Sequence, residues 1–200
     1  MRQELRRELK TIRSQLGAAD KMAAAEAVAA RVIAHLPDSG GTLAGYWASA
    51  GELPLHILQL RLPANWVWCL PVVQPDRQLL FAPWRAGDDL ATNRYGIPEP
   101  TLAASSCLRP DELNAVLVPL LGFTRQGRRL GMGGGFYDRS LAYLARRSSW
   151  RKPTLLGLAH ECQKVKRLAQ ASWDVPLNGT VTDKKWYIAE GTPLESTAPK

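Results

Sequence analysis

Residues 115–143 run from a continuous apolar segment through a basic loop into a cluster of glycines, and no other stretch restricts the fold as strongly. The apolar segment Val116–Leu121, interrupted only by Pro119, is typical of a buried strand in a largely parallel sheet. The polar loop Thr124–Gly135 follows it, and Phe136–Arg147 is predicted to be a helix. Open α/β sheets bind ligands in loops after the carboxyl ends of strands, so this stretch predicts both a fold and a site.

Helical and extended patterns alternate through the rest of the chain. Apolar residues at helical spacing predict a first amphipathic helix that ends at Gly17, with basic residues on a neighbouring stripe. The other expected helices are Lys21–Leu36 and a short one from Pro54 to about Leu62, and the other expected strands are Thr42–Trp47, Trp66–Leu70, Leu79–Pro83, Thr154–Ala159 and the end of Trp173–Val181. Residues 87–106 are predicted to form a long surface connection. The alternation predicts an α/β fold with an open, mostly parallel sheet flanked by helices, three-layered and Rossmann-like.

A chain of 200 residues, 46% of them hydrophobic and 22% charged, is typical of one globular domain. We expect that domain to span residues 1–190 and residues 191–200 to form a flexible polar tail. The apolar stretches are far shorter than the ~18 residues of a membrane-spanning helix, and no secretory signal follows the basic N-terminus. Three widely spaced cysteines without a Cys-x-x-Cys pair favour a reducing compartment. The prediction is a cytoplasmic protein without a membrane partner, acting as a monomer.

The net charge of +8 favours a polyanionic partner such as nucleic acid or a phosphate-rich small molecule. Seven tryptophans could stack on bases, but they are scattered along the chain. Acidic residues are interleaved with basic ones outside the first helix, which disfavours one continuous basic surface. A small phosphate-bearing ligand is therefore the first hypothesis, and a basic nucleic-acid-binding module is an alternative.

The glycine cluster and its arginines have the chemistry of a phosphate site. Glycine permits positive φ angles and close backbone approach, so N–H groups of Gly131 and Gly133–Gly135 can converge on an anion. Arg125, Arg128 and Arg129 lie in the same loop, and arginine can bind phosphate oxygens through two donors. The stretch matches neither GxxxxGK[ST] nor GxGxxG. A flexible basic surface loop is the structural alternative.

Within this stretch, LGFTRQGRRLGMGGGFYDRSL resembles the signature of the 5-formyltetrahydrofolate cyclo-ligase family, also called 5,10-methenyltetrahydrofolate synthetase. Further similar segments follow the family's order: RQELRRELK, WASAGEL, NRYGIPEP, LGLAHECQ and SWDVPLNGTVTD. The resemblance implies an enzyme that uses ATP and Mg²⁺ to convert 5-formyltetrahydrofolate, with or without a polyglutamate tail, to 5,10-methenyltetrahydrofolate. ADP and phosphate are then released, and a phosphorylated formyl group is the intermediate.

The resemblance also assigns residues. Those expected to bind ATP are Arg2, Gln3, Glu4, Leu5, Arg6, Arg129, Leu130, Gly131, Met132, Gly133, Gly134, Gly135, Phe136 and Tyr137. Trp47, Glu52 and Tyr137 are expected at the folate, Arg129 and Tyr137 in catalysis, and Asp138 and Asp174 at Mg²⁺. The chain departs from the family pattern at three positions: Arg2 and Gly134 stand where lysine occurs, and Phe136 replaces the first of two tyrosines.

Several of these residues also admit structural roles. The N-terminal arginines could form a solvated helix face, Glu52 could cap the helix after Pro54, and Asp174 could cap a turn before Pro176. Trp47 is expected to be buried in either case, because a tryptophan at a strand end usually is.

Two further expectations concern function as a whole. His160-Glu161-Cys162 lacks the second histidine of HExxH and is predicted to be structural. A catalytically silent nucleotide-binding protein on the same fold is the nearer alternative to an enzyme. The glycine loop is expected to be mobile when empty, because glycine loses the most entropy on ordering.

Overall fold

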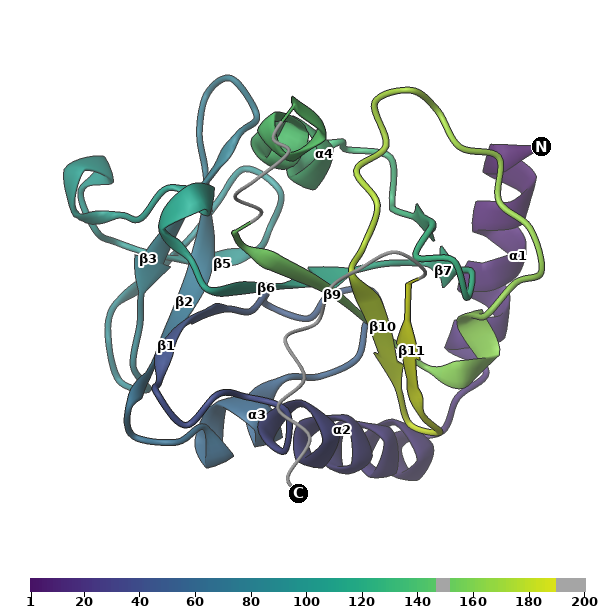
Figure 1. The fold of residues 1–200 in the computed structure, drawn as a ribbon, viewed down its shortest axis with the longest axis horizontal. Coiled ribbons are helices and arrows are strands. Elements are labelled where there is room, and N and C mark those ends of the chain that lie inside the picture. Colours follow the sequence, from purple (N-terminus) through teal and green to yellow (C-terminus); the bar gives the residue numbers. More distant parts are fainter. Residues whose placement is uncertain (147–151, 190–200) are drawn as a thin grey trace.

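The computed structural model describes residues 1–146 and 152–189, and its centre is a seven-stranded sheet (Figure 1). The strand order is β11-β10-β9-β6-β1-β2-β3. The strands are β1 (Gly41–Ala44), β2 (Trp66–Val73), β3 (Leu79–Pro83), β6 (Ala115–Pro119), β9 (Thr154–Ala159), β10 (Gly179–Thr182) and β11 (Trp186–Ile188). The five inner strands run parallel, and the edge strands β3 and β11 are antiparallel to their neighbours. The predicted open, mostly parallel sheet is confirmed.

Helices cover both faces of this sheet (Figure 1). Helices α2 (Ala18–Ile33) and α3 (His56–Arg61) lie on one face, and α4 (Phe136–Leu141) lies on the other. The small apolar side chains of α2, including Ala25, Val28 and Val32, are buried against Leu43 of β1 and Leu117 of β6. A second buried cluster fills the space between the sheet and α4. The three-layer α/β architecture predicted from the alternation is therefore present.

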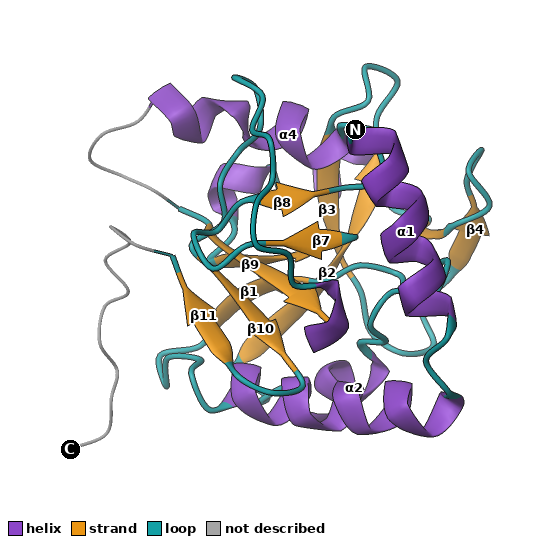
Figure 2. Ribbon diagram, turned by 90° about the vertical axis from the view of Figure 1, so that its right-hand side faces the viewer, coloured by secondary structure: helices purple, strands orange, loops and turns teal. Residues whose placement is uncertain are grey.

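Helix α1 (Arg2–Ser14) stands beside the small two-stranded hairpin of β7 (Gly122–Phe123) and β8 (Arg129–Leu130), as Figure 2 shows. Leu9 of the predicted apolar stripe is buried with Leu130 and Leu168. The hairpin carries the chain from the end of β6 into the glycine cluster. The first helix and the glycine cluster therefore rest on the same element.

Several elements differ from the prediction. The expected connection at residues 87–106 contains a hairpin of β4 (Leu90–Thr92) and β5 (Pro98–Pro100), and a 3₁₀ turn at Ala104–Ser106. The Asn93 side-chain oxygen accepts the N–H groups of Tyr95 and Ile97 and so closes the hairpin turn.

Two other predicted elements need correction. The loop 124–135 includes strand β8, and the α-helix that begins at Phe136 ends at Leu141, followed by a 3₁₀ segment at Ala142–Arg146. Arg147, the expected end of that helix, and the expected tail 191–200 lie outside the described residues. Strand β11 was not predicted, and no helix of the described ranges is long and apolar enough to span a membrane.

Gly45 continues β1 and allows the chain to pass close to Trp68. Its N–H donates to the carbonyl of Cys69, and a Cβ built at this position would lie 2.1 Å from the buried Trp68 ring. We expect Gly45→Ala to lower the free energy of unfolding by about 1–3 kcal/mol, because a rigid ring must move. Chemical denaturation measures the change, with Gly131→Ala as a control, because a Cβ there would lie at an ordinary 3.5 Å from the Arg129 side chain. Equal stability of the Gly45 variant and the wild type would contradict this prediction.

Candidate active site

A cavity of about 1110 Å³ opens at the carboxyl ends of the central strands. Trp47 follows β1, Val73 ends β2 and Pro119 ends β6, and all three line it. Strand β1 lies between β2 and β6, so the chain moves outward in opposite directions on the two sides of β1. This switch point is where an open α/β sheet forms a ligand crevice.

The glycine cluster forms one wall of the cavity. Gly131, Gly133, Gly134 and Gly135 all line it, and the φ angles of Gly133 and Gly135 are 108° and 69°. These left-handed conformations turn the backbone between β8 and α4 at little steric cost. Arg6 of α1 reaches this wall and donates from Nε to the Gly131 carbonyl at 2.9 Å. The sequence-predicted cradle and the first helix are therefore brought together.

Two arginine–aspartate pairs stand beside the glycine wall, and all four residues line the cavity. Arg129 donates to Asp138 Oδ1, which also accepts the N–H of Val175 at 3.1 Å. Arg2 donates to both oxygens of Asp174 at 3.1 and 3.3 Å. Each aspartate expected at Mg²⁺ is thus paired with an arginine expected at ATP.

Asp174 also has the structural role considered from the sequence. Its Oδ2 accepts the N–H of Ala171 at 2.8 Å and closes a turn. Within residues 1–146 and 152–189, no group of three or more His, Cys, Asp and Glu side chains could hold a metal ion. A divalent cation here would need ligands from another molecule as well as from these aspartates.

Glu52 lines the same cavity from another segment, the loop after β1. Its Oε2 accepts the backbone N–H of Ser49 at 3.0 Å and the Ser49 hydroxyl at 3.3 Å. Burial raises the pKa of Glu52, and Ser49 and the nearby Arg13 partly offset that rise. No side chain caps α3, so the alternative that Glu52 caps that helix is wrong.

Trp47 and Tyr137 present aromatic surface to the same cavity. The expectation that Trp47 is buried is wrong, since 39% of it is exposed, and its ring meets Trp84 edge-on at 6.2 Å. The Tyr137 hydroxyl is buried and has no hydrogen-bond partner within the described part of the chain. Burial raises the pKa of Tyr137 well above its usual value, so the hydroxyl keeps its proton. An unpaired buried hydroxyl at a cavity wall is available to a ligand.

Four of the residues expected at ATP do not line the cavity. Gln3 and Glu4 are exposed, and Glu4 pairs with the amino group of Met1. Leu5 and Leu130 pack in the apolar cluster beneath α1. The two leucines therefore support the wall from beneath. The remaining residues expected at ATP line the cavity.

The β4–β5 hairpin supplies cavity residues that sequence reasoning did not assign. Asn93, Tyr95, Ile97 and Glu99 line the cavity, and Tyr95 meets the Phe136 ring edge-on at 5.3 Å. The segment NRYGIPEP was recognised as family-like, which was the signal available. The residues had no assigned role, because the hairpin itself was not predicted.

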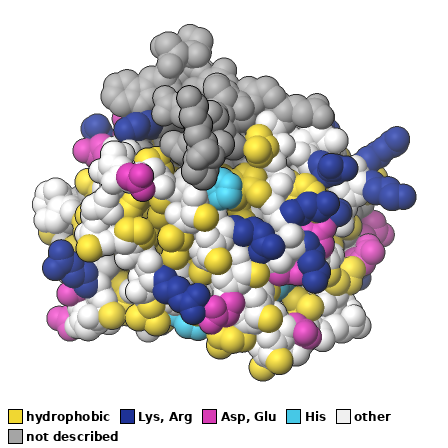
Figure 3. Space-filling model, turned by 60° about the horizontal axis from the view of Figure 1, so that its bottom comes forward, with side chains coloured by type: hydrophobic (Ala, Val, Ile, Leu, Met, Phe, Trp, Pro, Cys, Tyr) yellow, Lys and Arg dark blue, Asp and Glu magenta, His cyan; other side chains and the backbone are white. Residues whose placement is uncertain are grey.

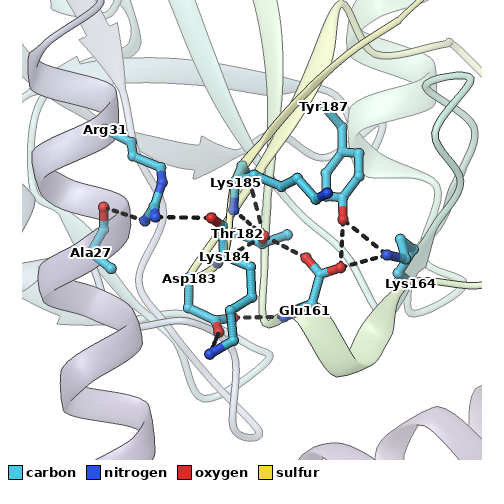
Figure 4. A network of polar contacts seen from close by, with 9 residues as sticks. All are labelled: Ala27, Arg31, Glu161, Lys164, Thr182, Asp183, Lys184, Lys185 and Tyr187. Atoms are coloured by element: carbon cyan, nitrogen blue, oxygen red, sulfur yellow. Dashed lines mark hydrogen bonds and ion pairs between the residues drawn. The ribbon is translucent and has the colours of Figure 1, made fainter.

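The segment His160-Glu161-Cys162 does not line the cavity, and the contacts of Glu161 shown in Figure 4 are structural, as predicted. Glu161 accepts hydrogen bonds from Tyr187, Lys164 and Thr182, which ties the end of β9 to β10 and β11. Burial alone would raise the pKa of Glu161, but these hydrogen bonds together lower it. Its carboxylate is fully engaged in joining three segments of the fold.

Sequence comparison finds relatives along most of the chain. The model of the 5-formyltetrahydrofolate cyclo-ligase family matches residues 1–183. A Haemophilus influenzae protein named 5-formyltetrahydrofolate cyclo-ligase is 34% identical over 182 residues, covering 88% of this chain and 94% of the relative. The Escherichia coli K12 protein of the same name is 38% identical over 150 residues, covering 72% and 79%.

Structure comparison agrees with this result. The 5,10-methenyltetrahydrofolate synthetase of Aquifex aeolicus matches with a TM-score of 0.78 and 26% identity, over 98% of this chain and 97% of that one. The Mycoplasma pneumoniae protein of the same name matches with a TM-score of 0.70, over 91% and 98%; its 24% identity supports the fold alone. The α/β fold described above is shared with both.

Proposed function

The chain belongs to the 5-formyltetrahydrofolate cyclo-ligase family and is a ligase, and we propose that it closes 5-formyltetrahydrofolate to 5,10-methenyltetrahydrofolate with ATP and Mg²⁺. ADP and phosphate are the other products. The observation that carries this proposal is that one cavity joins the arginine–glycine wall to the Glu52 loop. Such a cavity has room for a nucleotide and a second ligand side by side.

The proposed chemistry explains why both walls are needed. The formyl oxygen of the substrate is a poor leaving group, so it first takes the γ-phosphoryl group of ATP. N10 of the folate then attacks the formyl carbon and gives up its proton to solvent, and the phosphate leaves with the former formyl oxygen. Phosphoryl transfer needs mainly positioning and neutralisation of charge. The protein supplies both without a covalent intermediate of its own.

The phosphate role falls to the glycine wall. Backbone N–H groups of residues 131–136 and the guanidinium groups of Arg2, Arg6 and Arg129 supply hydrogen bonds and positive charge to the triphosphate. Arg129 lies beside the glycine wall, since a Cβ at Gly131 would lie 3.5 Å from its Nη1, and it is the most buried of these three arginines. We assign it the stabilisation of the transferred phosphoryl group.

The folate role is assigned to residues of the same cavity that lie outside the glycine wall. Trp47 offers an apolar surface to the ring system, and Glu52 offers a carboxylate that accepts N–H groups of the pterin. Tyr137 lines the cavity too, and both Glu52 and Arg129 act electrostatically on the pKa of its hydroxyl. Its unpaired hydroxyl would donate to an oxygen at the reacting centre.

The donor set fits Mg²⁺, which usually takes one or two carboxylates together with substrate phosphates and water. Asp138 and Asp174 are the residues that would hold it. When bound, the ion supplies neutralisation of phosphate charge. Both aspartates are paired with arginines proposed to bind phosphate, so the charge of each aspartate is offset before the nucleotide arrives.

The distribution of surface charge favours this small-molecule site over a nucleic-acid module. On the face shown in Figure 3, acidic and basic side chains are interleaved, and the exposed Arg61 pairs with Glu26 on α2. The arginines proposed for phosphate instead line the cavity. We further propose that the enzyme is a cytoplasmic monomer with one domain, and that it accepts the folate with or without a polyglutamate tail.

The test is to incubate purified protein with 5-formyltetrahydrofolate, Mg²⁺ and ATP and to record the absorbance of the methenyl product. We expect product formation that requires ATP. Nucleotide binding without product would identify the silent binder instead. Failure to form product under conditions in which a known cyclo-ligase works would reject the proposal.

The glycine wall should become ordered when nucleotide binds, because its residues have little side-chain packing to hold them. We expect amide hydrogen exchange at residues 131–135 to slow when Mg·ATP is added, while exchange in the buried strand β6 stays unchanged. Equal exchange of the loop with and without nucleotide would contradict this expectation.

A further inference from the structure

Arg13 is a buried cation on α1 that does not line the cavity. Only 2% of the residue is exposed, which makes it one of the largest fully buried side chains of the described residues. No carboxylate of the described residues forms an ion pair with it. Burying a guanidinium group costs free energy unless its N–H groups are hydrogen-bonded. The hydrogen bonds of Arg13 therefore indicate what this side chain does.

Both contacts of Arg13 are with backbone carbonyls next to the cavity. Nη2 donates to the Ala50 carbonyl at 2.6 Å, and Nη1 donates to the Leu120 carbonyl at 3.4 Å. Ala50 lies in the loop after β1, and Leu120 follows Pro119 at the end of β6. One planar guanidinium thus connects the segments that leave β1 and β6, the two strands at the switch point.

The loop that Arg13 holds is the one that carries Glu52. Ala50 and Gly51 have φ angles of 47° and 79°, the first of which is unfavourable for a residue with a side chain. The Ser49 carbonyl accepts the N–H of Glu52, and the Glu52 carboxylate accepts the N–H of Ser49. The turn is closed on itself, and among the described residues only Arg13 connects it to α1 by a side-chain hydrogen bond.

We propose that Arg13 is a positioning residue for Glu52: it fixes the loop 49–52 against the end of β6, so that the carboxylate faces the folate side of the cavity. This inference rests on the proposed function of Glu52. It adds a role for the first helix beyond phosphate binding. Arg6 of the same helix holds the Gly131 carbonyl, so α1 connects the walls of the cavity at two points.

Arg13 influences Glu52 through its positive charge as well as through its hydrogen bond to the loop. Burial raises the pKa of Glu52, whereas Ser49 and Arg13 oppose that rise. The other titratable groups near this carboxylate are Tyr46 and Tyr137, whose pKa values burial raises. Both phenols stay neutral in the working range of pH. Arg13 is therefore the cation identified as acting on Glu52.

Two substitutions separate geometry from charge. Arg13→Lys keeps the positive charge but cannot offer two donors in a fixed plane. Arg13→Met removes the charge and the donors. Arg7→Met removes a charge from the exposed side of the same helix and serves as the matched control. Each protein is assayed for the Michaelis constants of folate and ATP and for the pH dependence of kcat/KM.

We expect both Arg13 variants to raise the folate KM by about 10-fold or more, the usual effect of losing a hydrogen bond from a charged group, with less than about 2-fold change in the ATP KM. Arg13→Met should also shift the acidic limb of the pH profile of kcat/KM for the folate to higher pH, because the charge that lowers the pKa of Glu52 is lost. Arg13→Lys keeps that charge and should leave the acidic limb in place. Arg7→Met should behave as the wild type. Equal effects on folate and ATP, or an unmoved acidic limb in Arg13→Met, would overturn the proposal.

A measurement without substrate separates this proposal from the proposed reaction. Amide hydrogen exchange of Ser49 and Glu52 should be faster in Arg13→Lys than in the wild type, and exchange at residues 131–135 should be unchanged. If the wild type forms no methenyl product but the loop loosens as expected, the reaction is wrong and the positioning role stands. If neither variant folds, Arg13 supports the whole fold and the positioning role is rejected.

Discussion

Replacing Arg129 by methionine should lower kcat for ring closure by about 10²–10³-fold, the range observed when one preorganised donor is removed from a transition-state charge. The side chain is 6% exposed, lines the cavity and sits beside Gly131. Its guanidinium lies in an environment poor in water, where a positive charge acts strongly on a transferring phosphoryl group. Nucleotide affinity should fall less than kcat, because Arg2, Arg6 and the backbone amides remain.

The comparison that isolates this effect uses Arg125→Met, which removes an exposed arginine of the same loop that does not line the cavity. Arg129→Lys keeps a charge without the planar pair of donors and should fall between the wild type and Arg129→Met. Thermal unfolding of each variant establishes that it is folded. A folded Arg129→Met enzyme with kcat within about 2-fold of the wild type would remove Arg129 from the reaction.

The glycine wall could be predicted from the sequence because its determinants are local. An apolar strand, three loop arginines and the glycine cluster of residues 131–135 follow one another in the sequence, and the backbone freedom of glycine does not depend on distant contacts. The parallel sheet followed from the alternation of helices and strands for the same reason. Asp138 and Arg129 are nine residues apart, and the turn between them brings them together.

The features that were missed depend on contacts between distant residues. Strand β11 has only three residues and is defined by its pairing with β10. The hairpin of β4 and β5 is equally short, and the Asn93 side chain closes it. Arg13 looked like one more basic residue of the first helix, but its partners lie 37 and 107 residues away. Periodicity cannot identify such partners.

Trp47 departs from the usual burial of tryptophan because it lines the cavity. A tryptophan at the end of a strand is usually buried, yet this one leaves 39% of its surface open toward the cavity. Its partner Trp84 is buried and holds the ring from one side. The sequence alone could not distinguish these two tryptophans, because the difference arises from the cavity.

Replacing Glu52 by glutamine should reduce kcat/KM for the folate by about 10- to 100-fold, because a hydrogen bond to a charged acceptor contributes about 1.5–3 kcal/mol. The amide keeps the shape of the side chain but accepts weakly and adds two donors. The KM for ATP should stay close to that of the wild type, since the Glu52 carboxylate is hydrogen-bonded to Ser49 and not to the arginines proposed to bind phosphate. Glu8→Gln on the exposed side of α1 is the control. If kcat/KM for the folate were the same in Glu52→Gln as in the wild type, the assignment of Glu52 to the pterin would be contradicted.

The pH dependence gives this prediction a second readout. The proposed role requires an ionised carboxylate, and burial raises the pKa of Glu52 above that of an ordinary glutamate. As the pH falls through that raised pKa, the carboxylate takes up a proton, and kcat/KM for the folate should fall with it. The acidic limb of the wild-type profile should therefore lie above the ordinary glutamate range and be absent from Glu52→Gln, because an amide does not titrate. An acidic limb that persists unchanged in Glu52→Gln would assign it to another group and leave Glu52 without its proposed role in binding the pterin.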